Sequence, residues 1–152
     1  MDHHNIEAFY IIGIFIRTTN ENGQSAQDIP ALWTKFMSEN IADQIPDKAD
    51  SSVYCIYTDY EKDYTRPYTT ILGRRVNSLD HIPEGMIGKA IAKGIYSKQT
   101  AIGNIAGGSV YNEWLKIWNS DLDWAYTADF EIYGDKAQNP ENAEVDIYVA
   151  IK

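Results

Sequence analysis

The sequence is poor in the residues that mark several common classes of protein. Cys55 is its only cysteine, so no disulfide forms within the chain, and we expect a reducing environment. The apolar run from Phe9 to Ile16 is much too short to span a bilayer. The N-terminus also lacks the basic and apolar regions of a signal peptide. These absences predict a cytoplasmic protein that is not bound to a membrane.

Basic residues are also scarce. The chain has 13 Lys and Arg against 22 Asp and Glu, which gives a formal net charge of -9. Because nucleic-acid affinity depends on neutralising phosphates, this balance argues against direct binding to DNA or RNA. The spacings His-x-x-x-His and Cys-x-x-Cys do not occur, and the glycine-rich segment 103–108 lacks the lysine of a phosphate-binding loop. We therefore predict neither a metal nor a cofactor.

Aromatic residues with a polar tip are abundant instead. The chain has 11 Tyr and 4 Trp among 152 residues. Such side chains suit half-buried surfaces and ligand cavities, because the ring packs while its hydroxyl or N–H group forms a hydrogen bond. The length predicts a single domain with a substantial core.

The order of the predicted elements repeats. Each half reads as strand, helix, strand, strand, and Trp33-Thr-Lys-Phe-Met-Ser in the first helix is similar to Trp114-Leu-Lys-Ile-Trp-Asn in the second. We predict an α+β fold built from a duplicated βαββ unit, with halves at about 1–77 and 90–152. Two such units form a curved antiparallel sheet with both helices on one face and a ligand cleft between the halves, lined by the other face. His3 and His4 are expected in a mobile terminus. The predicted strands are 9–16, 52–60, 68–77, 93–102, 124–134 and 143–151, and the helices begin near Asp28 and Ser109.

The last two predicted strands alternate in polarity. Asp129, Glu131 and Tyr133 share one face of the first, and Asp146 and Tyr148 share one face of the second. If the polar faces of these two strands lie on the same side of the sheet, two carboxylates and two phenols gather there. That face is either solvated surface or the lining of a pocket.

Six segments of the chain share an order and spacing that match a known pattern, namely 29–33, 54–60, Gly73, 114–118, 125–133 and 145–152. Together they resemble the GyrI-like effector-binding domain. This domain is the ligand domain of certain AraC-type and MerR-type regulators and also occurs as a stand-alone protein. The resemblance agrees with the duplicated fold and spans nearly the whole chain. It departs from many members at Ala150, where they have a proline, and it includes no DNA-binding domain.

The resemblance implies a binding function and a set of site residues. In multidrug-sensing members a glutamate ringed by aromatic residues meets lipophilic cations, and here that glutamate is Glu131, with Tyr148 beside it. Without the resemblance, an exposed position on the strand is the favoured interpretation of Glu131. The places of Tyr57, Tyr68, Trp33 and Trp118 in the predicted fold make each of them either a ring of the pocket or a packing side chain of the core, and we expect them in the pocket. Trp114 is assigned to the core and Asp129 to no role.

Two alternatives remain open at this point. Some relatives are similar to hydrolases that open strained rings of DNA-alkylating natural products, and Glu131 with Tyr57 or Tyr148 would then direct a water molecule. The family's namesake acts on DNA gyrase, so a regulator or gyrase is a candidate protein partner. We expect binding of a small amphipathic, cationic aromatic compound rather than catalysis.

Overall fold

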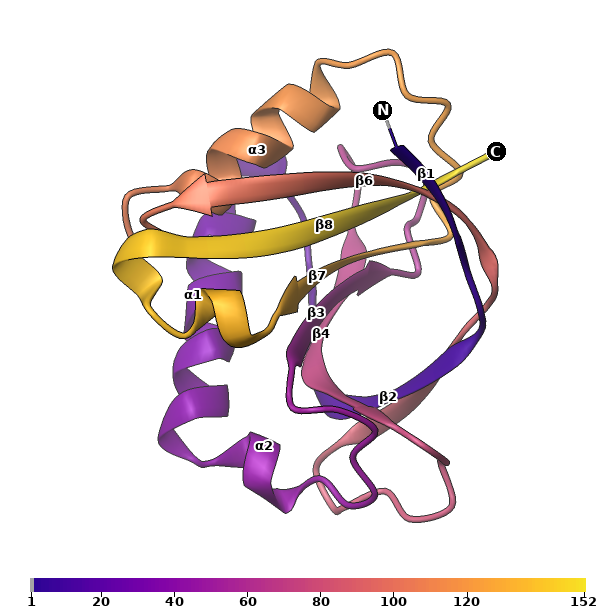
Figure 1. Cartoon of the computed structure of the whole chain (residues 1–152), viewed down its shortest axis with the longest axis vertical. Coiled ribbons are helices and arrows are strands. Elements are labelled where there is room, and N and C mark those ends of the chain that lie inside the picture. Colours follow the sequence, from indigo (N-terminus) through magenta and orange to yellow (C-terminus); the bar gives the residue numbers. More distant parts are fainter. Residues whose placement is uncertain (1) are drawn as a thin grey trace.

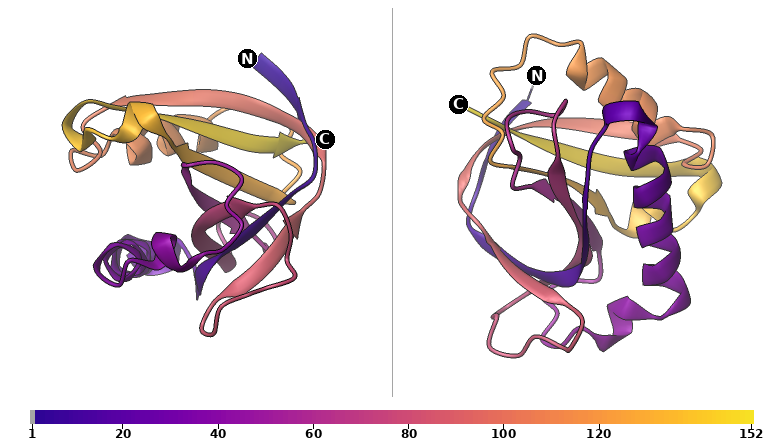
Figure 2. Two further views of the ribbon diagram at one scale, coloured as in Figure 1. Left: turned by 60° about the horizontal axis from the view of Figure 1, so that its bottom comes forward. Right: turned by 180° about the vertical axis from the view of Figure 1, so that it is seen from behind.

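Eight strands form one curved antiparallel sheet in the computed structural model, which describes residues 2–152 (Figure 1). The helices α1 and α3 lie on the same face of this sheet, as the predicted α+β fold requires (Figures 1 and 2). The elements are β1 (Asp2–Ile6), β2 (Phe9–Thr18), η1 (Glu21–Gly23), α1 (Ser25–Ser38), α2 (Ile41–Gln44), β3 (Val53–Thr58), β4 (Tyr68–Val76), β5 (Ile87–Ile91), β6 (Gly94–Gly103), α3 (Ser109–Trp118), β7 (Ala128–Tyr133), η2 (Asp135–Ala137), η3 (Pro140–Asn142) and β8 (Ala143–Ile151).

The strand order confirms the predicted duplication. It runs β1-β6-β8-β7-β3-β4-β2-β5, so β2, α1, β3 and β4 of the first half match β6, α3, β7 and β8 of the second. The central strands β3 and β7 pair antiparallel, with Cys55 opposite Glu131 and Tyr57 opposite Asp129. The junction of the two halves therefore lies between β3 and β7, which carry the predicted glutamate and one of its rings.

Two strands were not expected from the sequence, β1 and β5. β1 pairs with β6, so His3 and His4 lie in the sheet, and the prediction of a mobile terminus there is wrong. β5 pairs with β2 at the other edge and spans residue 90, where the second half was expected to begin. Both strands are short and lie at sheet edges, where polar residues are common and the hydrophobic pattern is weak.

The sheet curls strongly because of how these edge strands are connected. β1 and β2 lie near opposite ends of the strand order, yet only residues 7 and 8 separate them in the chain. β5 and β6 are related in the same way through residues 92 and 93. Such short connections require the two ends of the sheet to approach each other, and Figure 2 shows the resulting half-barrel.

The two helices begin close to their predicted positions. α1 begins at Ser25, before the expected cap Asp28, whose carboxylate instead lies in the first turn and accepts hydrogen bonds from Thr18 Oγ1 and Gln24 Nε2. α3 is capped by Gly108 with φ of 94°, so the expected cap Ser109 is its first residue. This left-handed backbone conformation favours glycine.

Both faces of the sheet are buried. One face carries a cluster that includes Phe9, Ile56 and Phe130, and the other packs against α1 and α3 in two further clusters. Tyr57 and Tyr133 contact both helix-side clusters, so they lie between α1 and α3. In the described part of the chain, every helix is too short or too polar to cross a membrane.

Candidate ligand-binding pocket

A cavity of about 340 Å³ lies between α1, α3 and the central strands. We call it the α1–α3 pocket. All four Trp of the chain line it, and most of its other large side chains are Tyr. It is lined by Asn20, Ser25, Ala26, Ile29, Pro30, Trp33, Tyr57, Tyr60, Tyr64, Tyr68, Val110, Tyr111, Trp114, Trp118, Trp124, Glu131 and Tyr133.

Glu131 is the charged residue of the pocket, and within residues 2–152 no other charged side chain lines it. Its side chain is only 1% exposed. Tyr133 Oη donates to Oε1 at 2.6 Å, while Tyr57 Oη and Trp114 Nε1 donate to Oε2 at 2.8 Å and 2.6 Å. Three donors from β3, α3 and β7 thus hold this carboxylate at the junction of the two halves.

The electrostatic state of Glu131 follows from these contacts. Burial raises the pKa of Glu131, and the hydrogen bonds from Tyr133, Trp114, Tyr57 and the Cys55 thiol offset part of that rise. Within the described chain, none of the ion pairs includes this carboxylate. The charge of Glu131 is therefore stabilised by neutral donors alone.

The rings around Glu131 are arranged in contact with one another. Trp33 meets Tyr133 edge to face at 4.8 Å, and Tyr57 meets Trp114 in the same manner at 5.5 Å. Trp114 and Trp124 lie nearly parallel, with 16° between their planes. At one end of the pocket, Asn20 accepts hydrogen bonds from Tyr68 and Ser25, so the polar groups there are already paired.

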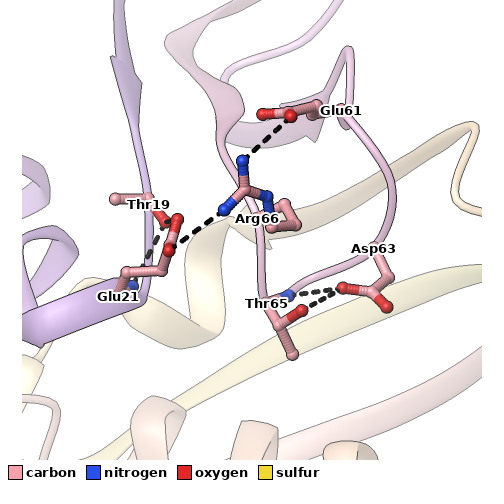
Figure 3. Close-up of polar contacts among 6 residues, drawn as sticks. All are labelled: Thr19, Glu21, Glu61, Asp63, Thr65 and Arg66. Carbon is pink, nitrogen blue, oxygen red and sulfur yellow. Dashed lines mark hydrogen bonds and ion pairs between the residues drawn. The ribbon is translucent and has the colours of Figure 1, made fainter.

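Part of the pocket wall is the connection between β3 and β4, which we call loop 59–67. Tyr60 and Tyr64 of this loop line the pocket, and Tyr64 stacks against Trp118 at 5.3 Å. On the outside, Figure 3 shows Arg66 between Glu21 and Glu61, with nitrogen to oxygen distances of 3.2 Å and 3.1 Å. Arg66 thus links the outer side of the loop to Glu21, while the inner side of the loop is aromatic.

The structure brings together all but one of the predicted site residues. Glu131, Tyr57, Tyr68, Trp33 and Trp118 line the α1–α3 pocket. The cleft itself was expected on the face away from the helices, and that expectation is wrong, because the pocket lies on the helix-covered face.

Tyr148 is the predicted site residue that lies elsewhere. The β7–β8 register sets Glu131 opposite Ile147 and Phe130 opposite Tyr148, and the rings of the latter pair stack at 5.0 Å. Tyr148 therefore packs on the far face of the sheet, so the two polar faces of β7 and β8 do not coincide. Both sides of this sheet are buried, so the face of β8 that packs against α3 is apolar as well.

The geometry adds to two further assignments. Trp114 was assigned to the core and is buried there, but it also lines the pocket and donates to Glu131, four residues from Trp118 on the same helical stripe. Asp129 was given no role, yet it is 0% exposed and accepts hydrogen bonds from Tyr60 and Trp124. Tyr133, two residues after Glu131 on the same strand face, was also recoverable from the alternation. Tyr60 and Trp124 fell inside the predicted strands 52–60 and 124–134, where alternation assigns them to the face away from Glu131, but β3 ends at Thr58 and β7 begins at Ala128. Tyr64 lies in a loop without a periodic signal.

Comparison with known proteins relates nearly the whole chain to one family. Residues 4–151 match the family model of Cass2, the integron-associated effector-binding protein. YobU of Bacillus subtilis (strain 168), which is named as a proposed transcriptional regulator, is 31% identical over 147 residues, covering 92% of this chain and 90% of YobU.

Two solved structures share the fold. The integron cassette protein VCH_CASS2 from the mobile metagenome of Vibrio cholerae has 30% identity and a TM-score of 0.78, covering 99% of this chain and 95% of that one. SAV2435 bound to tetraphenylphosphonium has a TM-score of 0.82 over 99% of this chain and 93% of that one, but at 14% identity it shows the fold alone. With the family model matching residues 4–151 and the GyrI-like fold observed throughout, the chain belongs to the Cass2 family of integron-associated effector-binding proteins.

Proposed function

We propose that the protein binds lipophilic organic cations in the α1–α3 pocket, with Glu131 as their counter-ion. One observation carries this proposal. Glu131 is a buried carboxylate in a cavity walled by aromatic rings, and none of the ion pairs in the described chain includes it.

The physical reason is the cost of burying a charge. An ionised carboxylate in an apolar cavity loses its hydration, and neutral donors compensate only in part. A bound organic cation removes that cost and gains attraction from each ring that faces it, at about 0.5–2 kcal/mol per ring. A neutral ligand of the same shape gains only the apolar contact.

The hydrogen bonds to Glu131 favour binding over catalysis, because they fill three of the roughly four acceptor sites of the carboxylate. Its two oxygens accept hydrogen bonds from Tyr57, Tyr133 and Trp114 at 2.6–2.8 Å. A general base needs a free lone pair aimed at a water molecule or substrate proton. The arrangement suits a carboxylate that stays in place as a counter-ion better than one that activates water in a ring-opening hydrolase.

The comparisons support the same direction. The family description names an effector-binding protein, and a protein of the same fold, SAV2435, binds the lipophilic cation tetraphenylphosphonium. The cavity volume of about 340 Å³ falls at the lower end of the range of small-molecule sites, roughly 300–1,000 Å³. A compound with a few aromatic rings matches this size.

The direct test is thermal unfolding of the wild-type protein with tetraphenylphosphonium. At a concentration of about 100 times Kd, a ligand that binds only the folded state adds about 2.7 kcal/mol to its stability. For a chain of this size we expect a Tm increase of about 8 °C. Triphenylphosphine oxide, a neutral compound with similar rings, is expected to produce a much smaller increase. Equal increases with both compounds would refute the role of charge, and no increase with a panel of lipophilic cations would refute the ligand class.

A pair of tyrosine variants tests which face of the sheet forms the site. Tyr57→Phe keeps the ring but removes a donor to Glu131 at 2.8 Å, so we expect tetraphenylphosphonium affinity to fall by about 5-fold. Tyr148→Phe makes the same chemical change on the opposite face, where Tyr148 stacks on Phe130, and we expect affinity to stay within about 2-fold of wild type. Isothermal titration calorimetry measures both. A loss in Tyr148→Phe as large as that in Tyr57→Phe would contradict the placement of the site.

A further inference from the structure

A second buried carboxylate, Asp129, lies directly behind the pocket wall. It precedes Glu131 by two residues on the same face of β7 and is 0% exposed. Its Oδ2 accepts hydrogen bonds from Tyr60 Oη at 2.5 Å and Trp124 Nε1 at 2.9 Å, and its Oδ1 accepts one from the Ala150 N–H at 2.8 Å. Tyr60 and Trp124 line the α1–α3 pocket, whereas Asp129 does not.

The surroundings of Asp129 repeat those of Glu131. Each carboxylate accepts a hydrogen bond from a Tyr hydroxyl and from a Trp indole N–H. Within the described chain, none of the ion pairs includes Asp129. The rings of the pocket wall that donate to a buried carboxylate are Tyr57, Trp114 and Tyr133 for Glu131, and Tyr60 and Trp124 for Asp129.

Donation to an anion changes the donating ring. Hydrogen-bonded groups polarise one another, and the effect is stronger where the local dielectric constant is low. A phenol or indole that donates to a carboxylate gains electron density, so its face attracts a cation more strongly. Tyr60 and Trp124 present their rings to the cavity while their donor groups contact Asp129, so the charge of Asp129 acts on the cavity through them.

We propose that Asp129 is a second determinant of cation selectivity, which acts through the rings of Tyr60 and Trp124 without touching the ligand. This inference rests on the proposed function of the α1–α3 pocket. It assigns Asp129 as a positioning and polarising residue and Glu131 as the contacting counter-ion. Neutral ligands of similar shape gain nothing from Asp129 beyond the fixed orientation of the two rings.

The inference also predicts how selectivity depends on pH. The titratable groups that interact electrostatically with Asp129 are Tyr60 from loop 59–67, Tyr126 from the segment before β7 and Tyr96 from β6. Glu131 lies two residues further along the same face of β7, and β8 contributes the Ala150 amide. With no basic group among them, burial raises the pKa of Asp129 to about 7. Its charge therefore increases as the pH rises through neutrality, and the preference for cations over neutral compounds is expected to increase with it.

The test compares Asp129→Asn with wild type at pH 8, using tetraphenylphosphonium and triphenylphosphine oxide as probes in calorimetric titrations. We expect the affinity for the cation to fall by about 5-fold and that for the neutral compound to stay within about 2-fold. Asp146→Asn is the matched control, because Asp146 lies on β8 with a side chain 40% exposed, and both affinities should remain unchanged.

The outcomes separate the explanations. Equal loss for both probes in Asp129→Asn would mean that Asp129 only maintains the shape of the wall, and no loss for either would mean that its charge does not reach the cavity. Both results overturn the inference while leaving the proposed function intact. Failure of wild type to bind the cation would overturn the proposed function, and the inference with it.

A second variant covers the case in which Asp129→Asn does not fold. Tyr60→Phe keeps the ring in the wall and removes only the donor to Asp129. We expect cation affinity to fall by about 2- to 3-fold with no change for the neutral probe. An unchanged ratio of the two affinities in Tyr60→Phe would contradict polarisation through this ring.

Discussion

Replacing Glu131 by Gln is expected to lower the affinity for tetraphenylphosphonium by about 100-fold. The substitution keeps the size and shape of the side chain and removes its charge. Loss of one partner from a desolvated charge pair costs roughly 2–5 kcal/mol, and each 1.4 kcal/mol corresponds to a tenfold change. The wild-type site excludes water from this pair, because Glu131 is 1% exposed and rings surround it. Calorimetric titration gives the affinity, and a thermal shift assay should show almost no stabilisation of the variant by the cation.

The matched control for this variant is Glu84→Gln. Glu84 lies in an exposed turn and does not line the pocket, so the control changes the net charge equally without touching the site. We expect its affinity to match wild type, because exposed charges at a distance are screened by salt. If Glu131→Gln binds the cation as well as Glu84→Gln does, the counter-ion role of Glu131 is wrong. Binding of triphenylphosphine oxide should be similar in all three proteins.

The protein is expected to be less stable at pH 8 than at pH 5, by about 3 kcal/mol from Asp129 alone. Burial raises the pKa of Asp129 to about 7 in the folded protein, against about 3.9 for an unfolded aspartate. The folded state therefore binds more protons than the unfolded state between these values, so the free energy of unfolding decreases as the pH rises through them. The stabilisation is complete below about pH 4 and is lost above about pH 7. The pKa of Glu131 is raised by the same cause, which adds a contribution of the same sign.

Urea unfolding at pH 5, 6, 7 and 8 measures this dependence, and the matching decrease in Tm is about 8 °C. Asp129→Asn should show a much flatter profile, because the titrating group is gone. Its stability at pH 5 should be lower than that of wild type, since the protonated carboxyl group of Asp129 can still accept hydrogen bonds at both oxygens, whereas an amide accepts at only one. Asp146→Asn should keep the wild-type slope. A slope that is the same in Asp129→Asn and wild type would show that Asp129 is not the group responsible.

The arrangement of β7 and β8 explains which part of the site was predictable from sequence. Alternation along each strand correctly placed Glu131 and Phe130 on opposite faces of β7, and Ile147 and Tyr148 on opposite faces of β8. The face shared by two neighbouring strands depends on their register, and a shift by one residue exchanges the faces. When one face is solvated, polarity identifies it. Here both faces are buried, so polarity did not reveal that Ile147 rather than Tyr148 lies beside Glu131.

The loops explain what the sequence did not predict. Tyr60, Tyr64 and Trp124 lie outside the regular elements, and their rings enter the pocket wall through tertiary contacts. Tyr64 is placed by stacking on Trp118 and by a hydrogen bond from Asn20 Nδ2 to its carbonyl oxygen. Such contacts join residues far apart in the chain and leave no periodic pattern. The helices and the central strands, by contrast, follow from the spacing of their apolar residues, and they carry Trp33, Tyr57, Trp118 and Glu131.

The two-residue connections at the edges of the sheet have a consequence for synthesis and folding. β1 is made well before its partner β6, which follows only after the whole first half, since Ile6 pairs with Gly94. β5 belongs to the second half and completes the edge of the first by pairing with β2. Each half thus contributes its first strand to the sheet of the other half, as two chains do in a domain-swapped dimer. The first half cannot complete its sheet on the ribosome before β5 has emerged, and the many contacts distant in sequence favour slow, cooperative folding of the whole chain.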